Sequence, residues 1–69
     1  MYTHTHTKTN ALKIKSVIDR IGNVSCDIAK DDKSYRVTCD AINGNVFNAV
    51  RDMIEAGNKP STISAQDIA

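Results

Sequence analysis

Two stretches of alternating apolar and polar residues, separated by a short charged cluster, constrain the fold of this chain more than any other feature. The alternation has the period of a β-strand with one dry face. A four-residue loop at Asp31–Ser34 would join the stretches into an antiparallel hairpin whose apolar residues meet on one face. The predicted pairs are Ile28 with Val37, Cys26 with Cys39, and Val24 with Ala41. The side chains predicted to face water are Ser25, Asp27, Arg36, Thr38 and Asp40.

Residues 10–21 have the spacing of an amphipathic helix. Its apolar stripe consists of Ile14, Val17, Ile18 and Ile21. Thr9 or Asn10 can cap its start, and Gly22 stands where a left-handed residue commonly follows a helix. Leu12 falls about half a turn off the stripe. The opposite, polar side is predicted to carry Lys13, Lys15, Ser16, Asp19 and Arg20.

A second helix is predicted from Val46 onward, after the turn signal Asn43-Gly44. Asn43 or Asn45 can cap it, and Gly57, Asn58 and Pro60 end it. Phe47 lies at the margin of its apolar stripe and is predicted to be partly exposed. The full stripe is Val46, Phe47, Ala49, Val50, Met53 and Ile54.

Residues 10–59 are predicted to form a single domain. Residues 1–9 alternate Thr with Tyr, His and Lys, which suits either an edge strand or a polar tail. Residues 60–69 have no clear period and are expected to form a C-terminal tail. The element order is therefore (β)-α-β-β-α. We predict an α+β fold, a small two-layer sandwich in which two helices pack on one face of an antiparallel hairpin.

The composition is that of a small globular protein. Of the 69 residues, 41% are hydrophobic and 25% are charged, whereas a disordered chain would have fewer apolar residues and a larger net charge. A chain of this length buries only about 60% of its unfolded surface. That excludes a large enclosed active site and favours self-association. The predicted core consists of Ile14, Val17, Ile18, Ile21, Val24, Cys26, Ile28, Val37, Cys39, Val50, Met53 and Ile54.

The net charge of +1 is small, but the first third of the chain is basic. Four cations in this part of the chain stand against one acidic residue, Asp19. A solvated helix face explains this better than an anionic partner does. The cations are Lys8, Lys13, Lys15 and Arg20. We expect no signal peptide, because residues 1–9 are polar, and no membrane span. The protein is therefore expected to be cytoplasmic, with Cys26 and Cys39 as buried thiols rather than a disulfide.

The sequence contains no recognisable catalytic or cofactor-binding motif. His4 and His6 are two possible metal ligands, whereas a structural zinc site needs four and a catalytic site three. The apolar neighbours of the cysteines argue against a reactive thiol. Asp31 and Asp32 are explained by the turn, and no glycine belongs to a phosphate-binding loop. We therefore expect no enzyme activity, no metal and no cofactor.

The favoured function is that of a non-enzymatic protein-binding module. Proteins of this size are often small regulators or inhibitors of a larger protein, such as the accessory proteins of phages and mobile elements. The alternative is a small nucleic-acid-binding regulator that uses the basic face of the first helix, although we expect no exposed aromatic pair on the sheet for base stacking. The partner is expected to be a protein, with a homodimer as a further possibility. The candidate contact residues are Leu12, Lys13, Lys15, Arg20 and Phe47.

Overall fold

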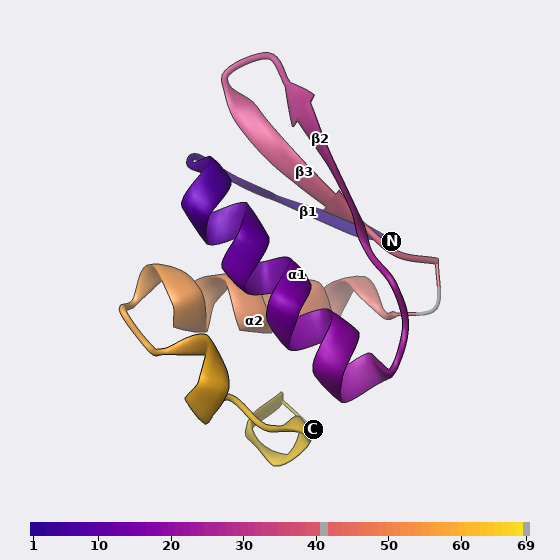
Figure 1. Cartoon of the computed structure of the whole chain (residues 1–69), viewed down its shortest axis with the longest axis vertical. Helices are drawn as coiled ribbons and strands as arrows, with labels where there is room; N and C mark the ends of the chain where they lie inside the picture. The colour runs from indigo at the N-terminus through magenta and orange to yellow at the C-terminus, as the bar shows by residue number, and fades with distance from the viewer. Residues whose placement is uncertain (41, 69) are drawn as a thin grey trace.

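The computed structural model describes residues 1–40 and 42–68, and Figure 1 shows their arrangement. The strands are β1 (Tyr2–Thr5), β2 (Asp27–Asp31) and β3 (Ser34–Thr38). The helices are α1 (Lys8–Gly22) and α2 (Gly44–Glu55), followed by two short 3₁₀ turns, Pro60–Thr62 and Ala65–Ile68. One antiparallel three-stranded sheet and two helices confirm the predicted α+β class. No helix within the described residues is both long enough and apolar enough to cross a bilayer.

The sheet has the order β1-β3-β2, so the central strand is the last of the three along the chain. The hairpin of β2 and β3 has the predicted register, with Ile28 opposite Val37. Its loop is tighter than predicted, because Asp31 pairs with Ser34 and only two residues turn the chain. Asp32 adopts a φ of 56° there, a conformation that Asp tolerates better than most residues.

The ladder of the hairpin ends at the pair Asp27–Thr38, one residue short of the cysteines. Cys26 and Cys39 extend past this end and are both buried and free. The predicted pair of Val24 with Ala41 cannot be assessed, since Ala41 lies outside the described residues.

Helix α1 starts earlier than predicted, because Thr7 rather than Thr9 or Asn10 caps it. The Thr7 hydroxyl accepts a hydrogen bond from the Asn10 backbone at 3.1 Å, which satisfies one of the free N–H groups of the first turn. At the other end the left-handed residue is Asn23, with a φ of 50°, and not Gly22. Helix α2 begins after Asn43, one of its two predicted caps, which accepts from the Asn45 backbone at 2.7 Å.

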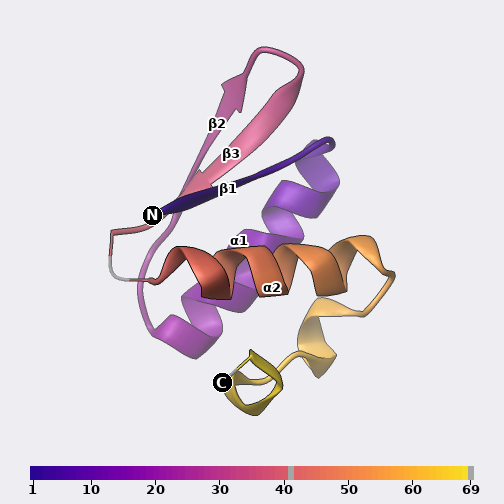
Figure 2. The same ribbon diagram turned by 180° about the vertical axis from the view of Figure 1, so that it is seen from behind.

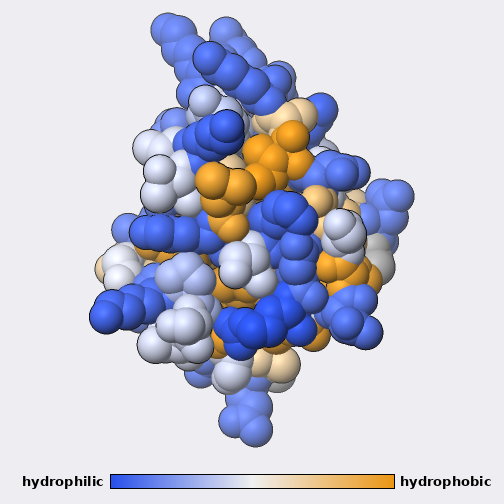
Figure 3. All heavy atoms as spheres, in the orientation of Figure 1, coloured by the Kyte–Doolittle hydropathy of each residue, from blue (hydrophilic) through white to orange (hydrophobic). Residues whose placement is uncertain are grey.

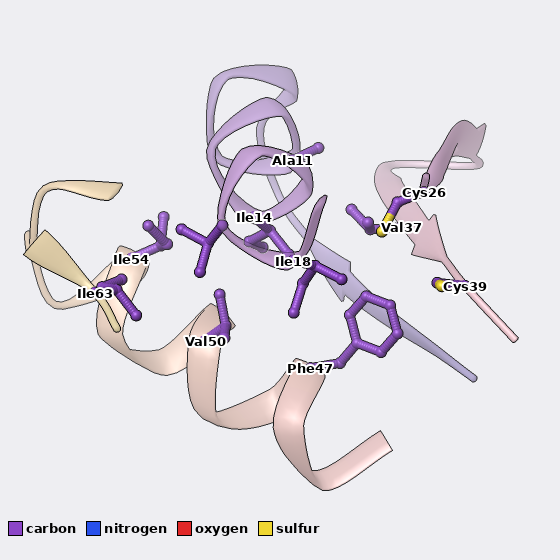
Figure 4. Close-up of a cluster of buried hydrophobic side chains, with 11 residues drawn as sticks. Ala11, Ile14, Ile18, Cys26, Val37, Cys39, Phe47, Val50, Ile54 and Ile63 are labelled. Carbon is purple, nitrogen blue, oxygen red and sulfur yellow. The ribbon is translucent and has the colours of Figure 1, made fainter. Parts of the chain in front are cut away.

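Both helices pack on one face of the sheet, α1 across all three strands and α2 along β1 (Figures 1 and 2). The hydrophobic core lies between these layers, as the close-up in Figure 4 shows. Eight of the twelve predicted core residues are buried, and the other four are half-buried against them: Ile21, Val24, Ile28 and Met53. The core also contains Ala11, Phe47 and Ile63, which the prediction leaves out.

The prediction that Phe47 lies at an exposed margin is wrong. Phe47 is fully buried, and its ring points from α2 toward α1 and the sheet (Figure 4). The margin of a helical stripe becomes buried when a second helix crosses it, and α1 crosses α2 here. Phe47 is therefore a core residue and is not available for contact with a partner.

The segment expected to form a C-terminal tail packs on the helices: Pro60–Thr62 contacts α1, and Ala65–Ile68 contacts α2. Ile63 is 2% exposed and belongs to the core. The Arg20 guanidinium donates to the backbone carbonyl oxygens of Pro60, at 2.7 Å, and of Ile63. Arg20 therefore anchors this segment to the helix.

Strand β1 attaches to the molecule through polar groups on its inner face. Thr3 and Thr5 are buried there, at 2% and 3% exposure. The Thr3 hydroxyl donates to Asn48 Oδ1 at 3.0 Å, and the Thr5 hydroxyl donates to Glu55 Oε1 at 3.4 Å, both on α2. Hydroxyls replace the aliphatic side chains that an inward strand face usually carries, which is why the sequence pattern of residues 1–9 has no apolar face.

Candidate interaction surfaces

The outward side of α1 carries a shallow depression with an exposed leucine. It has a volume of about 530 Å³, and we call it the α1 depression. Leu12 is 51% exposed, as its position off the apolar stripe predicts. Hydrophobic atoms are visible on the face of the molecule that α1 occupies (Figure 3). The residues that line the α1 depression are Leu12, Lys15, Ser16, Asp19 and Arg20.

An ion pair fixes the polar rim of the α1 depression. Lys15 Nζ lies 2.6 Å from Asp19 Oδ2, one helical turn away. Asp19 also accepts from the Cys26 backbone N–H at 2.9 Å, which ties α1 to the start of β2. Burial tends to raise the pKa of Asp19, but these two hydrogen bonds hold that pKa below its ordinary value. The hydrogen bond to Asp19 raises the pKa of Lys15 in turn, so the pair is charged across the neutral range.

The basic residues of α1 differ in whether another group of the protein holds their side chains. Lys15 is held by Asp19, and Arg20 by the carbonyl groups of the C-terminal segment. Lys8 and Lys13 are exposed and make no ion pair within the described residues. On the basic face predicted from the sequence, Lys8 and Lys13 are thus free of ion pairs with any described residue, whereas Lys15 is neutralised by Asp19 and Arg20 keeps its charge but is held by carbonyl groups.

A second, polar cleft lies where the end of β1 meets α2. Its volume is about 260 Å³. His4 lies 3.2 Å from Asp31, and Arg51 is held by Asp52 at 3.1 Å and by Glu55 at 4.0 Å. Sequence spacing could not reveal this cleft, because its walls come from segments about fifty residues apart. The cleft is lined by His4, Thr5, His6, Ser34, Arg51, Asp52 and Glu55.

The uncovered face of the sheet carries an aromatic pair that the sequence analysis does not expect. Tyr2 is 57% exposed, and its ring lies edge-on to His4 with the centroids 5.3 Å apart. Arg36 is opposite His4 on β3. The pair is exposed because β1 directs its even-numbered residues away from the helices, and it leaves the expectation of no aromatic pair for base stacking uncontradicted. An edge-on pair does not form the flat surface on which successive bases stack.

The two cysteines lie in the core and not at a surface. Burial, and next the hydrogen bond with Asp19, raise the pKa of the Cys26 thiol to about 12. A thiol with this pKa has very little nucleophilic thiolate at neutral pH. Cys26 and Cys39 therefore behave as small apolar side chains.

Within residues 1–40 and 42–68, no three His, Cys, Asp or Glu side chains are close enough together to hold a metal ion. His4 and His6 line the polar cleft, but they and its carboxylates do not form such a group of three. Comparisons of the chain with protein-family models, with curated proteins and with solved structures give no match.

Proposed function

We propose that this protein is a non-enzymatic protein-binding module, a small regulator or inhibitor of a larger protein, and that the α1 depression is its contact surface. The observation that carries the proposal is the half-exposed side chain of Leu12 in a depression whose other lining residues are polar or charged. An apolar anchor within a polar rim is the usual anatomy of a protein–protein contact. A partner side chain over Leu12 would remove apolar surface from water while the rim stays hydrated.

Charge specifies the kind of partner. Helix α1 has four cationic side chains and one acidic one, and no acidic residue in its first turn. Lys8 and Lys13 are free of ion pairs within the described residues. A segment that presents an aliphatic side chain to Leu12 and carboxylates to these ammonium groups fits the surface in both respects. The proposed partner is therefore an acidic, amphipathic segment of another protein.

Nucleic-acid binding is the second candidate, and the exposed cations Lys8 and Lys13 of α1 favour it. The engagement of Lys15 and Arg20 within the protein weighs against it, because phosphate binding needs free cations. Ionic strength separates the two candidates. A protein that neutralises several phosphates loses about a thousandfold or more in affinity between about 50 and 200 mM salt, whereas a contact anchored on apolar Leu12, with ion pairs only at Lys8 and Lys13, should weaken much less.

The test is quantitative affinity capture from a nuclease-treated lysate of the native host, with wild type and Leu12→Glu side by side. The captured protein is then purified and its affinity for each variant is measured. Leu12→Glu should weaken binding about tenfold or more, as expected for a buried anchor. Tyr2→Glu is the matched control, since Tyr2 is equally exposed but lies on the uncovered sheet face. Equal affinity of Leu12→Glu and wild type would rule out the α1 depression as the contact surface.

We also propose that the protein works in a reducing compartment such as the cytoplasm. Cys26 and Cys39 are neighbouring free thiols in the core, and reducing compartments keep such thiols reduced. Mass analysis of the protein from its host under alkylating conditions tests this point. A native disulfide would contradict it.

A further inference from the structure

We infer that the partner of the α1 depression is an α-helix of another protein that packs along α1, with an aliphatic residue against Leu12 and acidic residues against Lys8 and Lys13. This inference rests on the proposed function and specifies the secondary structure and the charge pattern of the partner. It is carried by the spacing of the residues on the outward side of α1, by the backbone of that helix and by the placement of its cations.

The outward side of α1 has the spacing of a helix–helix contact. A line of residues that recur after three or four positions runs along it, and we call this line the outward seam. Its members are Thr9, Leu12, Ser16 and Asp19. Together with Lys15, the last three line the α1 depression and have the i, i+3, i+4, i+7 arrangement that receives one side chain of a facing helix. Ser16 has the shortest side chain of these four, so the depression fits a single aliphatic side chain beside Leu12.

The backbone of α1 favours a helix over an extended segment as the occupant. Between the ends of a helix the N–H and C=O groups bond to each other, so α1 offers none of them to a partner there. A segment that binds in extended form gains its affinity from main-chain hydrogen bonds at the open edge of a sheet. The α1 depression is lined by side chains of α1 alone. A helix, whose own backbone groups are already paired, loses nothing by packing against it.

The cations of α1 lie along both flanks of the outward seam. At about 100° per residue, Lys8 and Lys15 fall on one flank, and Lys13 and Arg20 fall on the other. The charges at such flanking positions set the choice of partner when helices pack together. A second copy of α1 would place cations against cations, which is unfavourable. The pattern therefore selects an acidic helix rather than a second copy of this chain.

The two cations that are free to pair with a partner stand on either side of Leu12. Lys8 lies four residues before Leu12 on one flank, and Lys13 lies directly after it on the other. Both are exposed and make no ion pair within the described residues. Lys15 and Arg20, by contrast, are already held within the protein. The attraction for carboxylates is thus concentrated around the one apolar residue of the seam.

The free cations specify the sequence pattern of the partner helix. Lys8 and Lys13 are five residues apart on opposite flanks, so a helix that lies along α1 matches them with two acidic residues that are also five apart. The aliphatic residue that meets Leu12 then stands one position from one carboxylate and four positions from the other. In an extended chain, residues five apart point to opposite faces and lie about 17 Å from each other, whereas five residues of a helix rise only about 8 Å. The expected pattern is therefore specific to a helix.

Selection from two displayed peptide libraries tests the inference. One library presents a randomised face on a stable helix, and the other presents randomised linear segments with a central Pro, which prevents a helix. Binders are selected on the wild-type protein, and those that bind Leu12→Glu equally well are discarded. The helix library should yield an aliphatic residue with two acidic residues five apart around it. The linear library should yield no binder that depends on Leu12.

The outcomes separate this inference from the proposed function. Leu12-dependent binders from the linear library alone would overturn the inference and leave the α1 depression as a contact surface. Leu12-dependent helices without the five-residue acidic spacing would do the same. If no helix binds in a Leu12-dependent way, the inference fails, and the capture experiment with Leu12→Glu then decides the proposed surface by itself.

A double-mutant cycle tests the ion pair at Lys13 with a selected helix as the probe. Lys13→Gln, and Glu→Gln at the facing position of the helix, should each weaken binding about threefold at low salt, and the two changes together should weaken it no further. Lys33→Gln, which removes an exposed cation from the hairpin turn, is the control, because the Glu→Gln helix should still lose about threefold against it. Losses at Lys13 and on the helix that simply multiply would show that the two groups do not meet, and would overturn the assignment.

Discussion

Asp19 joins helix α1 to the start of the hairpin through one carboxylate. It accepts from Lys15 on its own helix, at 2.6 Å, and from the Cys26 backbone at the entrance to β2, at 2.9 Å. Nothing in the sequence pattern distinguishes it from a solvated helix residue, because its partner N–H comes from a loop. The residue that looks like ordinary surface is thus the link between α1 and the hairpin.

Asp19→Asn should destabilise the protein at neutral pH by about 1 kcal/mol, since the amide keeps an acceptor for the Cys26 N–H but loses the charge. The pKa of Asp19 is lower in the folded protein than its ordinary value of 3.8, so the unfolded chain binds the proton more tightly. The charged Asp19 carboxylate therefore stabilises the fold fully at pH values above 3.8, and this stabilisation is lost as the pH falls through the lower pKa of the folded protein.

Chemical denaturation of wild type and Asp19→Asn from neutral to strongly acidic pH checks this prediction. The difference in unfolding free energy between the two should shrink as the carboxylate is protonated. Lys33→Gln, which removes an exposed charge from the hairpin turn, serves as the control for general charge effects. A difference that stays constant across the acid range would show that the charge of Asp19 is irrelevant.

The C-terminal segment is an element whose importance comes from packing and not from its own pattern. Ile63 to Ala should cost about 2–5 kcal/mol, as for other buried aliphatic side chains, because Ile63 is 2% exposed within the core. Thermal or urea unfolding measures the loss. Ser61→Ala, an exposed change in the same 3₁₀ turn, should have little effect. An unfolding midpoint for Ile63→Ala equal to that of Ser61→Ala would show that the segment is not part of the cooperative unit.

Local patterns predicted the elements better than the contacts between them. The register of Ile28 with Val37 follows from the alternation and the place of the turn, because a shift by one residue would expose every apolar side chain of the hairpin. The stripes of both helices follow from the same kind of periodicity. Phe47 and Ile63 could not be placed in this way, since their burial depends on α1 crossing α2 and on Arg20 holding the last segment.

For the molecule as a whole, the layers of the fold were predictable and the surfaces were not. Because each helix and strand has a single apolar face to bury, few arrangements other than two helices on one side of a sheet are possible. The exposure of Leu12 was predictable from its angle on the helix. The polar cleft was not, because His4, Ser34 and Arg51 meet only after β1 pairs with β3. Pairing between residues distant in sequence leaves no mark on local periodicity.

The central place of β3 has a consequence for the order in which the molecule folds. Pairing β3 with β2 closes a loop of two residues, whereas pairing Thr5 with Tyr35 encloses about thirty, which costs about 2 kcal/mol more in chain entropy. We infer that the hairpin and α1 form the folding nucleus and that β1 joins after the rate-limiting step. In stopped-flow experiments, Thr3→Ala should therefore accelerate unfolding and leave the folding rate nearly unchanged, while Val37→Ala should slow folding. A slower folding rate for Thr3→Ala would mean that β1 is already packed against the rest of the protein in the folding transition state. The first strand along the chain would thus be the last to take its place.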